Sequence, residues 1–236
     1  MTDAMREFPA FAGDGYTLFY AEDPDPENLG CEGFPQTRLW IQRDDGTAEL
    51  VSELPEAGTI YPGPNGRILI VTGCEGFLGS LYHADVSVDG RFSNIEETYL
   101  ALEAAYGFEW VDRDTITLTA ATYEGAWGGK EDETRPLTID LETTEHVVIT
   151  TRGEAPVVAT VTECSLGNGT LTVVAEDDLF GQVRIDGDRV TYLDRTVTAT
   201  ASDTNEPDPD FPLWNMFGTT ATGEGVVVSV WGPDCF

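Results

Sequence analysis

Lysine is nearly absent from this sequence. Its 236 residues include one lysine, Lys130, and eleven arginines, against 43 aspartates and glutamates, which gives a formal net charge of −31. A protein that grips nucleic acid needs a basic surface to neutralise phosphate, so this composition excludes nucleic acid as a partner. Docking on anionic lipid is excluded for the same electrostatic reason.

Long apolar runs are absent as well. No stretch approaches the roughly 20 apolar residues that a membrane-spanning helix requires. Residues 1–13 contain no apolar run of the length found in signal peptides. We therefore expect no membrane insertion, and a protein that is made in the cytoplasm without a signal peptide.

Histidine is scarce, with two residues in the whole chain, which leaves little general-base chemistry at neutral pH. The Gly-x-Ser-x-Gly, His-Glu-x-x-His and Gly-x-x-x-x-Gly-Lys motifs of nucleophilic, zinc-dependent and phosphate-binding sites are missing. The four cysteines include no Cys-x-x-Cys pair for zinc. We predict no enzyme, no catalytic residue, no metal site and no cofactor. His83 and His146 are both interpreted as satisfied edge residues of strands.

The sequence is rich in tight-turn dipeptides followed by β-forming residues. Its hydrophobic content of 41% and aromatic content of 10% exclude a disordered chain. Asp45-Gly46, Asn65-Gly66 and Asp186-Gly187 are typical turn signals of this kind. Five similar β-rich runs are separated by 48 to 56 residues, and they begin at Tyr16, Arg67, Thr115, Thr170 and Val226. Such an interval corresponds to about one four-stranded unit.

A second set of predicted strands lies between these starts, at 37–43, 80–88, 134–141 and 181–185. The order of turn, buried strand, loop, second strand and turn resembles the blades of WD40-like and TolB-type β-propellers over most of the chain. The resemblance implies one all-β domain over 1–236, with four four-stranded blades and a fifth that is truncated or covered by a partner chain. Its repeat units lie at about 1–54, 55–100, 101–152, 153–203 and 204–236. Two packed β-sandwich domains that divide near Gly153 are the alternative.

The acidic residues are spread over every segment, and together with the lack of lysine they resemble the proteins of salt-loving archaea. In molar salt the Debye length is about 3 Å, so repulsion between surface carboxylates is screened. At low salt the same surface repels itself. An acidic interaction surface in an ordinary cell is the alternative, although such a surface usually forms a block.

The cysteines give a more specific signal. The tetrapeptide CEGF occurs at Cys31 and again at Cys74, after the second strand of adjacent repeats. Equivalent loops of neighbouring blades project from one face, so Cys31 and Cys74 are our candidates for a disulfide. Cys235 is expected on the same face and Cys164 on the opposite one. Two buried thiols inherited by repeat duplication are the alternative.

One loop tryptophan is a candidate for contact with a partner or ligand. Trp127 lies in a glycine-rich, charged loop at 125–133, close to Lys130. A tryptophan in such a loop can anchor a partner protein or stack on a sugar. We therefore select Trp127 and Lys130 as candidate contact residues, with a packing role as the alternative.

These observations predict a non-catalytic structural or attachment protein within a larger assembly. We expect a capsid- or tail-associated virion component of a halophilic archaeal virus, whose partners are other protein subunits and, as a further candidate, a glycan. The alternatives are a stand-alone carbohydrate- or protein-binding propeller of a haloarchaeon and a glycosidase-like enzyme. The last would need two carboxylates in the central funnel.

Overall fold

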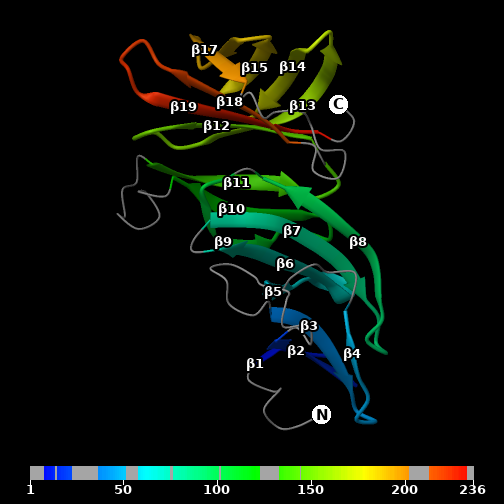
Figure 1. The fold of residues 1–236 in the computed structure, drawn as a ribbon. Helices are drawn as coiled ribbons and strands as arrows, with labels where there is room; N and C mark the ends of the chain where they lie inside the picture. The colour runs from blue at the N-terminus through cyan, green and yellow to red at the C-terminus, as the bar shows by residue number, and fades with distance from the viewer. Residues whose placement is uncertain are drawn as a thin grey trace. The chain divides into compact units, whose positions relative to one another are not determined.

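The computed structural model describes residues 8–13, 15–22, 37–51, 58–74, 77–100, 102–122, 133–143, 145–201 and 213–232. These residues form β-strands joined by turns, with one short 3-10 turn, η3, at Pro64–Gly66 (Figure 1). The prediction of an all-β fold is confirmed. No helix among the described residues is long and apolar enough to cross a membrane.

The first eleven strands form three sheets. The first sheet has the order β1-β2-β3-β4, with β1 Phe8–Ala12, β2 Tyr16–Glu22, β3 Thr37–Arg43 and β4 Ala48–Leu50. The second has the order β5-β6-β7-β8, with β5 Thr59–Pro62, β6 Arg67–Cys74, β7 Phe77–Val86 and β8 Phe92–Tyr99. The third contains three strands in the order β11-β10-β9, with β9 Ala104–Trp110, β10 Thr115–Ala121 and β11 Thr134–Asp140.

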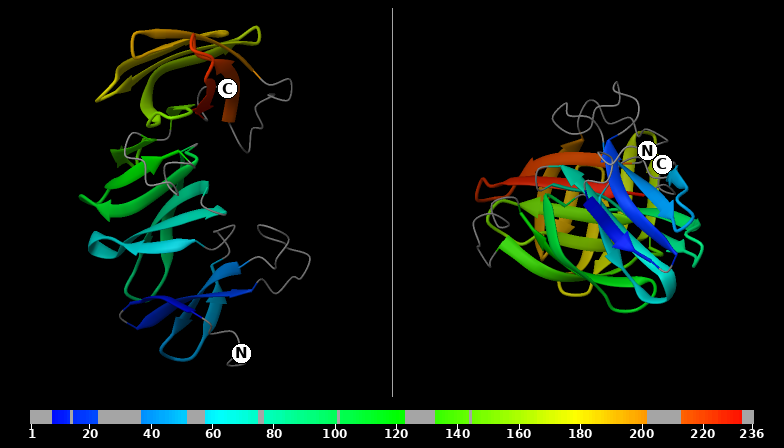
Figure 2. Two further views of the ribbon diagram at one scale, coloured as in Figure 1. Left: turned by 90° about the vertical axis from the view of Figure 1, so that its left-hand side faces the viewer. Right: turned by 90° about the horizontal axis from the view of Figure 1, so that it is seen from below.

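The last eight strands close into one barrel in sequence order. They are β12 His146–Thr151, β13 Val157–Gly167, β14 Thr170–Asp177, β15 Gly181–Asp186, β16 Arg189–Tyr192, β17 Arg195–Ala201, β18 Leu213–Thr219 and β19 Gly225–Trp231. The barrel closes because β12 pairs with β19, from His146 opposite Trp231 to Thr151 opposite Val226. Its strands run from yellow-green to red in Figure 1 and are seen from two further sides in Figure 2.

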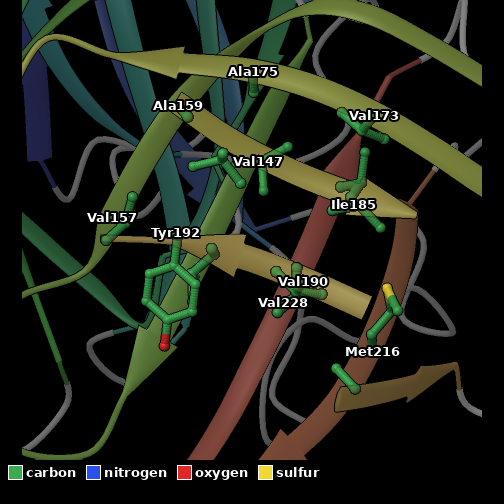
Figure 3. Packing of buried hydrophobic residues seen from close by; sticks show 14 of the residues in the cluster. Val147, Val157, Ala159, Val173, Ala175, Ile185, Val190, Tyr192, Met216 and Val228 are labelled. Carbon is green, nitrogen blue, oxygen red and sulfur yellow. The ribbon is translucent and has the colours of Figure 1, made fainter. Parts of the chain in front are cut away.

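The inside of the barrel is filled with apolar side chains. Alternate residues of each strand point inward, as expected for a pleated strand. The buried cluster includes Val147, Val157, Ala159, Val173, Ala175, Ile185, Val190, Tyr192, Met216 and Val228 (Figure 3). The barrel is therefore a packed core rather than a channel.

Four four-stranded blades with a truncated fifth are not observed, because the strands β12 to β19 pair with one another in a single closed barrel. Leu193 and Asp194 both have positive φ, at 48° and 57°, and they form a two-residue loop between the paired residues Tyr192 and Arg195. Such a loop returns the chain directly beside the strand it has just left. The strand β17 therefore continues the same sheet, and β18, the first strand of the predicted fifth unit, pairs with β17 instead of beginning a new blade. The edge of β19, predicted to be truncated or covered by a partner chain, is paired within the chain by β12.

Contacts divide the chain into two compact units. The first comprises 1–75, 79–98 and 109–116, and the second comprises 76–78, 99–108 and 117–236. The core of the first unit contains Tyr16, Leu18, Leu39, Ile41, Val51, Ile68, Ile70, Ala84 and Val86. The barrel core belongs to the second unit. The prediction that 1–236 form one domain with five repeat units stays a prediction.

Candidate functional site

A polar cavity of about 410 Å³ lies in the second unit, between β11 and the barrel strands β12, β13 and β14. Side chains alternate between the two faces of a strand. Side chains of β11 and side chains on the outer face of the barrel therefore line the same cavity. The lining residues are Arg135, Pro136, Leu137, Thr138, Ile139, Asp140, His146, Val158, Thr160, Thr162, Glu176, Asp177, Asp178 and Leu179.

Arg135 provides buried hydrogen-bond donors at this cavity. It is 8% exposed, and its Nη2 donates to Oδ2 of Asp177 at 2.7 Å. The guanidinium carbon lies 4.7 Å from the ring centroid of Phe180, within the range of a cation–π contact. Its Nε and Nη1 have no hydrogen-bond partner among the described residues. Burying such donors without a partner is costly.

Asp177 holds the guanidinium in place. Its Oδ1 accepts the backbone N–H groups of Leu179 and Phe180, each at 2.8 Å, while Oδ2 accepts from Arg135. Both carboxylate oxygens are therefore engaged, and the charge of Arg135 is balanced inside the protein. Because the ion pair with Asp177 already neutralises the guanidinium, the remaining guanidinium N–H groups do not require an anionic acceptor.

His146 provides a buried acceptor at the same cavity. It is 2% exposed, and its Nε2 lies 3.1 Å from the carbonyl oxygen of Thr143. A carbonyl only accepts, so Nε2 carries the proton and Nδ1 is the unprotonated nitrogen. Burial lowers the pKa of His146 to about 4, which keeps the ring neutral at neutral pH. Nδ1 has no hydrogen-bond partner among the described residues.

His146 differs from its predicted role. It was expected to be a satisfied residue at a strand edge, but β12 pairs with β13 on one side and with β19 on the other. Barrel closure, which the sequence pattern did not indicate, places His146 in the interior of the sheet. Its buried and unpartnered Nδ1 shows that it is not satisfied by the described protein atoms.

A row of polar side chains crosses the outer barrel face beside the cavity. His146 lies opposite Thr160, and Thr160 lies opposite Glu176 on the next strand. Their sequence neighbours Val147 and Ala159 point into the barrel core, so the row faces outward (Figure 3). Thr160 and Glu176 are exposed, whereas His146 is buried. The cavity therefore has a buried end at His146 and an open end at Glu176.

Carboxylates surround the open end. Asp140, Glu176 and Asp178 border the cavity and are exposed, while the charge of Asp177 is balanced by Arg135. The local field is consequently negative, which disfavours an anionic ligand. Within the described residues no group of three or more His, Cys, Asp and Glu side chains is placed to hold a metal ion.

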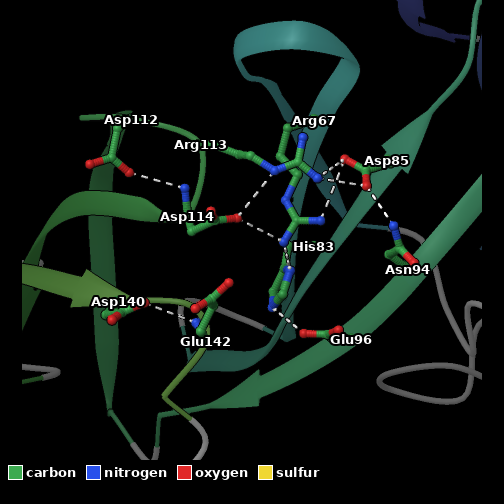
Figure 4. A network of polar contacts seen from close by, with 10 residues as sticks. All are labelled: Arg67, His83, Asp85, Asn94, Glu96, Asp112, Arg113, Asp114, Asp140 and Glu142. Atoms are coloured by element: carbon green, nitrogen blue, oxygen red, sulfur yellow. Dashed lines mark hydrogen bonds and ion pairs between the residues drawn. The ribbon is translucent and has the colours of Figure 1, made fainter.

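A second polar cluster occupies the first unit (Figure 4). Arg67 is 4% exposed and donates through Nη2 to Nδ1 of His83 at 2.6 Å. Asp85 and Asp114 lie 3.5 and 3.4 Å from its guanidinium, and Arg113 pairs with Asp85 at 2.9 Å. The buried charge of Arg67 is thus compensated by the partly exposed carboxylates of Asp85 and Asp114, which is typical of a structural network. The predicted satisfaction of His83 is confirmed by Arg67, although β7 lies inside its sheet rather than at an edge.

The residues singled out from the sequence are mostly not described. Cys31, Trp127 and Lys130 lie outside the described residues, and of Cys74 only the backbone, at the end of β6, is described. Cys164 is disulfide-bonded. The Cys31–Cys74 pairing and the contact role of Trp127 and Lys130 stay predictions.

Arg135 is not among the predicted site residues, although a signal for it is present. In β11 the burial alternates along TRPLTID, so that Arg135 shares the buried face with Leu137 and Ile139. A charged residue at the apolar phase of an alternating strand has to find a buried partner. The position of Arg135 in this alternation therefore marks it as a buried charge. No local pattern reveals that His146 faces the same cavity from another strand.

No protein-family model matches the chain, and no curated protein matches it. Among solved structures, the apo structure of the AtxE2 isopeptidase is similar at 11% identity and a TM-score of 0.38. The alignment covers 90% of this chain and 48% of that protein, so the chain spans about half of its length. A likeness of this size transfers neither a fold nor an activity to this chain.

The function predicted from the sequence is contradicted by these comparisons. A virion component was expected, with a carbohydrate- or protein-binding propeller and a glycosidase as alternatives, but the similar structure is an isopeptidase and nothing supports a virion structural role. The prediction depended on acidic composition and on missing motifs. Acidic composition bears on solvation, and missing motifs exclude certain reactions. Neither property identifies an assembly to which the protein belongs.

Proposed function

We propose that this protein is a binding module that takes an amide-containing ligand into the cavity at β11. The observation that carries the proposal is a pair of deeply buried side chains, Arg135 and His146, that line one cavity and each retain side-chain nitrogens without a partner. The unpartnered nitrogens of Arg135, Nε and Nη1, are donors, and that of His146, Nδ1, is an acceptor. An amide supplies the complementary groups, because its C=O accepts and its N–H donates.

Charge and size support a neutral amide. A carboxylate ligand would meet a guanidinium already balanced by Asp177 and a rim of acidic residues, so it would gain little from the site. A cavity of about 410 Å³ lies in the range that accommodates small molecules or a few residues of a peptide. The polar groups at its buried end would fix the orientation of the bound amide.

Binding fits these residues better than catalysis. With its pKa lowered to about 4, His146 is a weak general base at neutral pH. The described residues that line the cavity include neither serine nor cysteine as a nucleophile. Its threonines, at 138, 160 and 162, are exposed, and none of their hydroxyls donates a hydrogen bond to a histidine or carboxylate among the described residues.

The proposal is tested by titrating the protein in molar salt with N-acetylglycine methylamide, followed by amide chemical shifts in NMR spectra. We expect millimolar binding, as is usual for a ligand of fewer than about ten heavy atoms, with shifts at β11 and β12. Methyl acetate, which has no N–H group for His146, should bind more weakly. Equal shifts with both compounds would show that His146 does not select an amide.

Two variants locate the binding. Arg135→Met removes the donors and His146→Phe removes the acceptor, and each should weaken binding at least about fivefold, the effect of roughly one hydrogen bond. Arg195→Met is the matched control, because it also removes an arginine ion pair, to Glu154 at 2.8 Å, from another part of the barrel. Undiminished binding in both Arg135→Met and His146→Phe, with circular dichroism showing intact folding, would contradict the proposal.

The composition supports a second proposal, that the protein works in concentrated salt. The accessible surface of 12483 Å² is shared by 43 acidic residues, about 290 Å² for each. At that density, screening by salt is needed to limit repulsion.

The regular starts of β2, β6, β10 and β14 at the predicted residues support descent from propeller-type repeats of the WD40-like and TolB kind. The disulfide at Cys164 supports exposure to an oxidising environment.

A further inference from the structure

The strand β11 has a free side. It is an outer strand of a three-stranded sheet, whereas the sheets β1–β4 and β5–β8 have four strands each. Within the described part of the chain, no strand pairs with the side of β11 that faces away from β10. An exposed strand edge presents a row of backbone N–H and C=O groups to any strand that can approach it.

One hydrogen bond identifies which backbone groups face this free side. The N–H of Thr122, directly after β10, donates to the C=O of Glu133, directly before β11, at 3.1 Å. In a strand, the N–H and C=O of one residue point to one side and those of the next residue to the other. Residues 133, 135, 137 and 139 therefore face β10, and residues 136, 138 and 140 face the free side.

Pro136 agrees with this assignment. Proline has no N–H, so it is tolerated in a sheet where that position points away from the neighbouring strand. The C=O of Asp140 is already used, because it accepts the N–H of Thr143 at 3.1 Å. The groups left for an incoming strand are the C=O of Pro136, both backbone groups of Thr138 and the N–H of Asp140.

The cavity described above follows this free side. It is bordered by six consecutive residues of β11, from Arg135 to Asp140, whose side chains alternate between the two faces of the sheet. A space that touches residues of both faces runs along the side of the strand rather than over one face. It is lined by Thr138 as well as by Arg135 and His146.

We propose that an extended peptide carrying basic side chains adds to β11 as a fourth strand. This inference rests on the proposed function, because it makes the bound amide a peptide bond. Thr138 would exchange both of its backbone hydrogen bonds with one peptide residue, as in strand addition to a sheet edge. Basic side chains of the peptide would lie beside Asp140, Glu176 and Asp178.

Hydrogen exchange resolved at single amides tests the proposal on the intact protein. In the free protein we expect slow exchange at Leu137 and Ile139, which face β10, and fast exchange at Thr138 and Asp140. The probe is an acetylated hexapeptide amide of alternating threonine and lysine, added in molar salt. At about ten times its Kd, it should slow exchange at Thr138 and Asp140 about tenfold and leave Leu137 unchanged.

Two further peptides separate pairing from charge attraction. The same sequence with N-methyl groups on alternate residues can pair through one edge only. Methylation of the edge that pairs with β11 should abolish the protection of Thr138. Methylation of the opposite edge should leave that protection unchanged. Replacing lysine by glutamate should weaken binding. Slow exchange at Thr138 before any peptide is added, or no protection by the lysine peptide at about millimolar concentration, would overturn the proposal, because strand pairing depends mainly on main-chain groups.

Variants of Thr138 distinguish this inference from the proposed function. Thr138→Pro removes one outward N–H at a position where a proline is tolerated, and it should weaken peptide binding about tenfold or more. Thr138→Val keeps the N–H and should bind as the wild type does. If Thr138→Pro binds the peptide normally while His146→Phe does not, the amide site stands and the strand addition is wrong. If neither variant weakens binding, both are wrong.

Discussion

Acidification should destabilise the barrel through the single imidazole of His146. Burial lowers the pKa of this group to about 4 in the folded protein, whereas an exposed histidine titrates near 6.5. Between these two values the unfolded chain binds a proton that the folded barrel does not, so stability rises with pH in that window. The contribution is complete above about pH 6.5 and is lost as the pH falls towards 4.

The size of the effect follows from the two pKa values. Their difference of about 2.5 corresponds to about 3 kcal/mol in the free energy of unfolding. About 2 kcal/mol of this is lost between about pH 7 and about pH 5, before most carboxylates titrate. Such a loss is a large part of the stability of an ordinary domain.

The measurement is urea denaturation in molar salt at both pH values, followed by tryptophan fluorescence, since Trp214 and Trp231 lie on barrel strands. His146→Gln is the reference protein, because its side-chain amide can still donate to the carbonyl of Thr143 but does not titrate. The wild type should lose about 2 kcal/mol more than this variant on acidification. Equal losses in the two proteins would refute the reasoning, because His146 would then not be held neutral by burial.

Three further predictions concern stability. Lowering the salt from about 1 M to about 0.1 M lengthens the Debye length from about 3 to about 10 Å. Repulsion between the surface carboxylates then increases, so the Tm should fall. An unchanged Tm in calorimetry would contradict the proposed adaptation to salt. Asp177→Asn leaves the buried guanidinium of Arg135 without its counter-charge and should cost about 3 kcal/mol or more in urea denaturation. Gly66→Ala should cost more than about 2 kcal/mol, because its φ is +81° and a Cβ would lie 2.5 Å from the carbonyl oxygen of Val86. Gly46→Ala, with a similar φ and no atom within 4 Å, is the matched control and should cost about half as much.

Local features of the fold could be predicted because they depend on local chemistry. The strand that follows Asn65-Gly66 begins at Arg67, as predicted, and β3 covers 37–43 as predicted. Turn dipeptides and β-branched residues act within a few positions, so the sequence alone specifies them. The assembly of strands into sheets depends on longer distances. The loop of Leu193 and Asp194 lacks the usual Asn-Gly signature, so its tight geometry was not predicted, and no local pattern indicated that β12 would pair with β19.

The candidate site was harder to predict for a related reason. Its two buried polar groups, Arg135 and His146, come from different sheets, and their proximity depends on barrel closure. Each taken alone has an ordinary structural interpretation. The free side of β11 is also invisible in the sequence, because the residues that would complete a four-stranded unit are used by the barrel instead.

Barrel closure has a consequence for how the protein folds. His146 pairs with Trp231, which lies 85 residues later in the chain, so the loop closed by β12 and β19 is long and costly in entropy. Contacts of such high sequence separation form slowly. A ribosome must therefore synthesise β19 before His146 can be covered and the cavity wall completed. The cavity wall is therefore completed only after β19 has been made, well after the two four-stranded sheets.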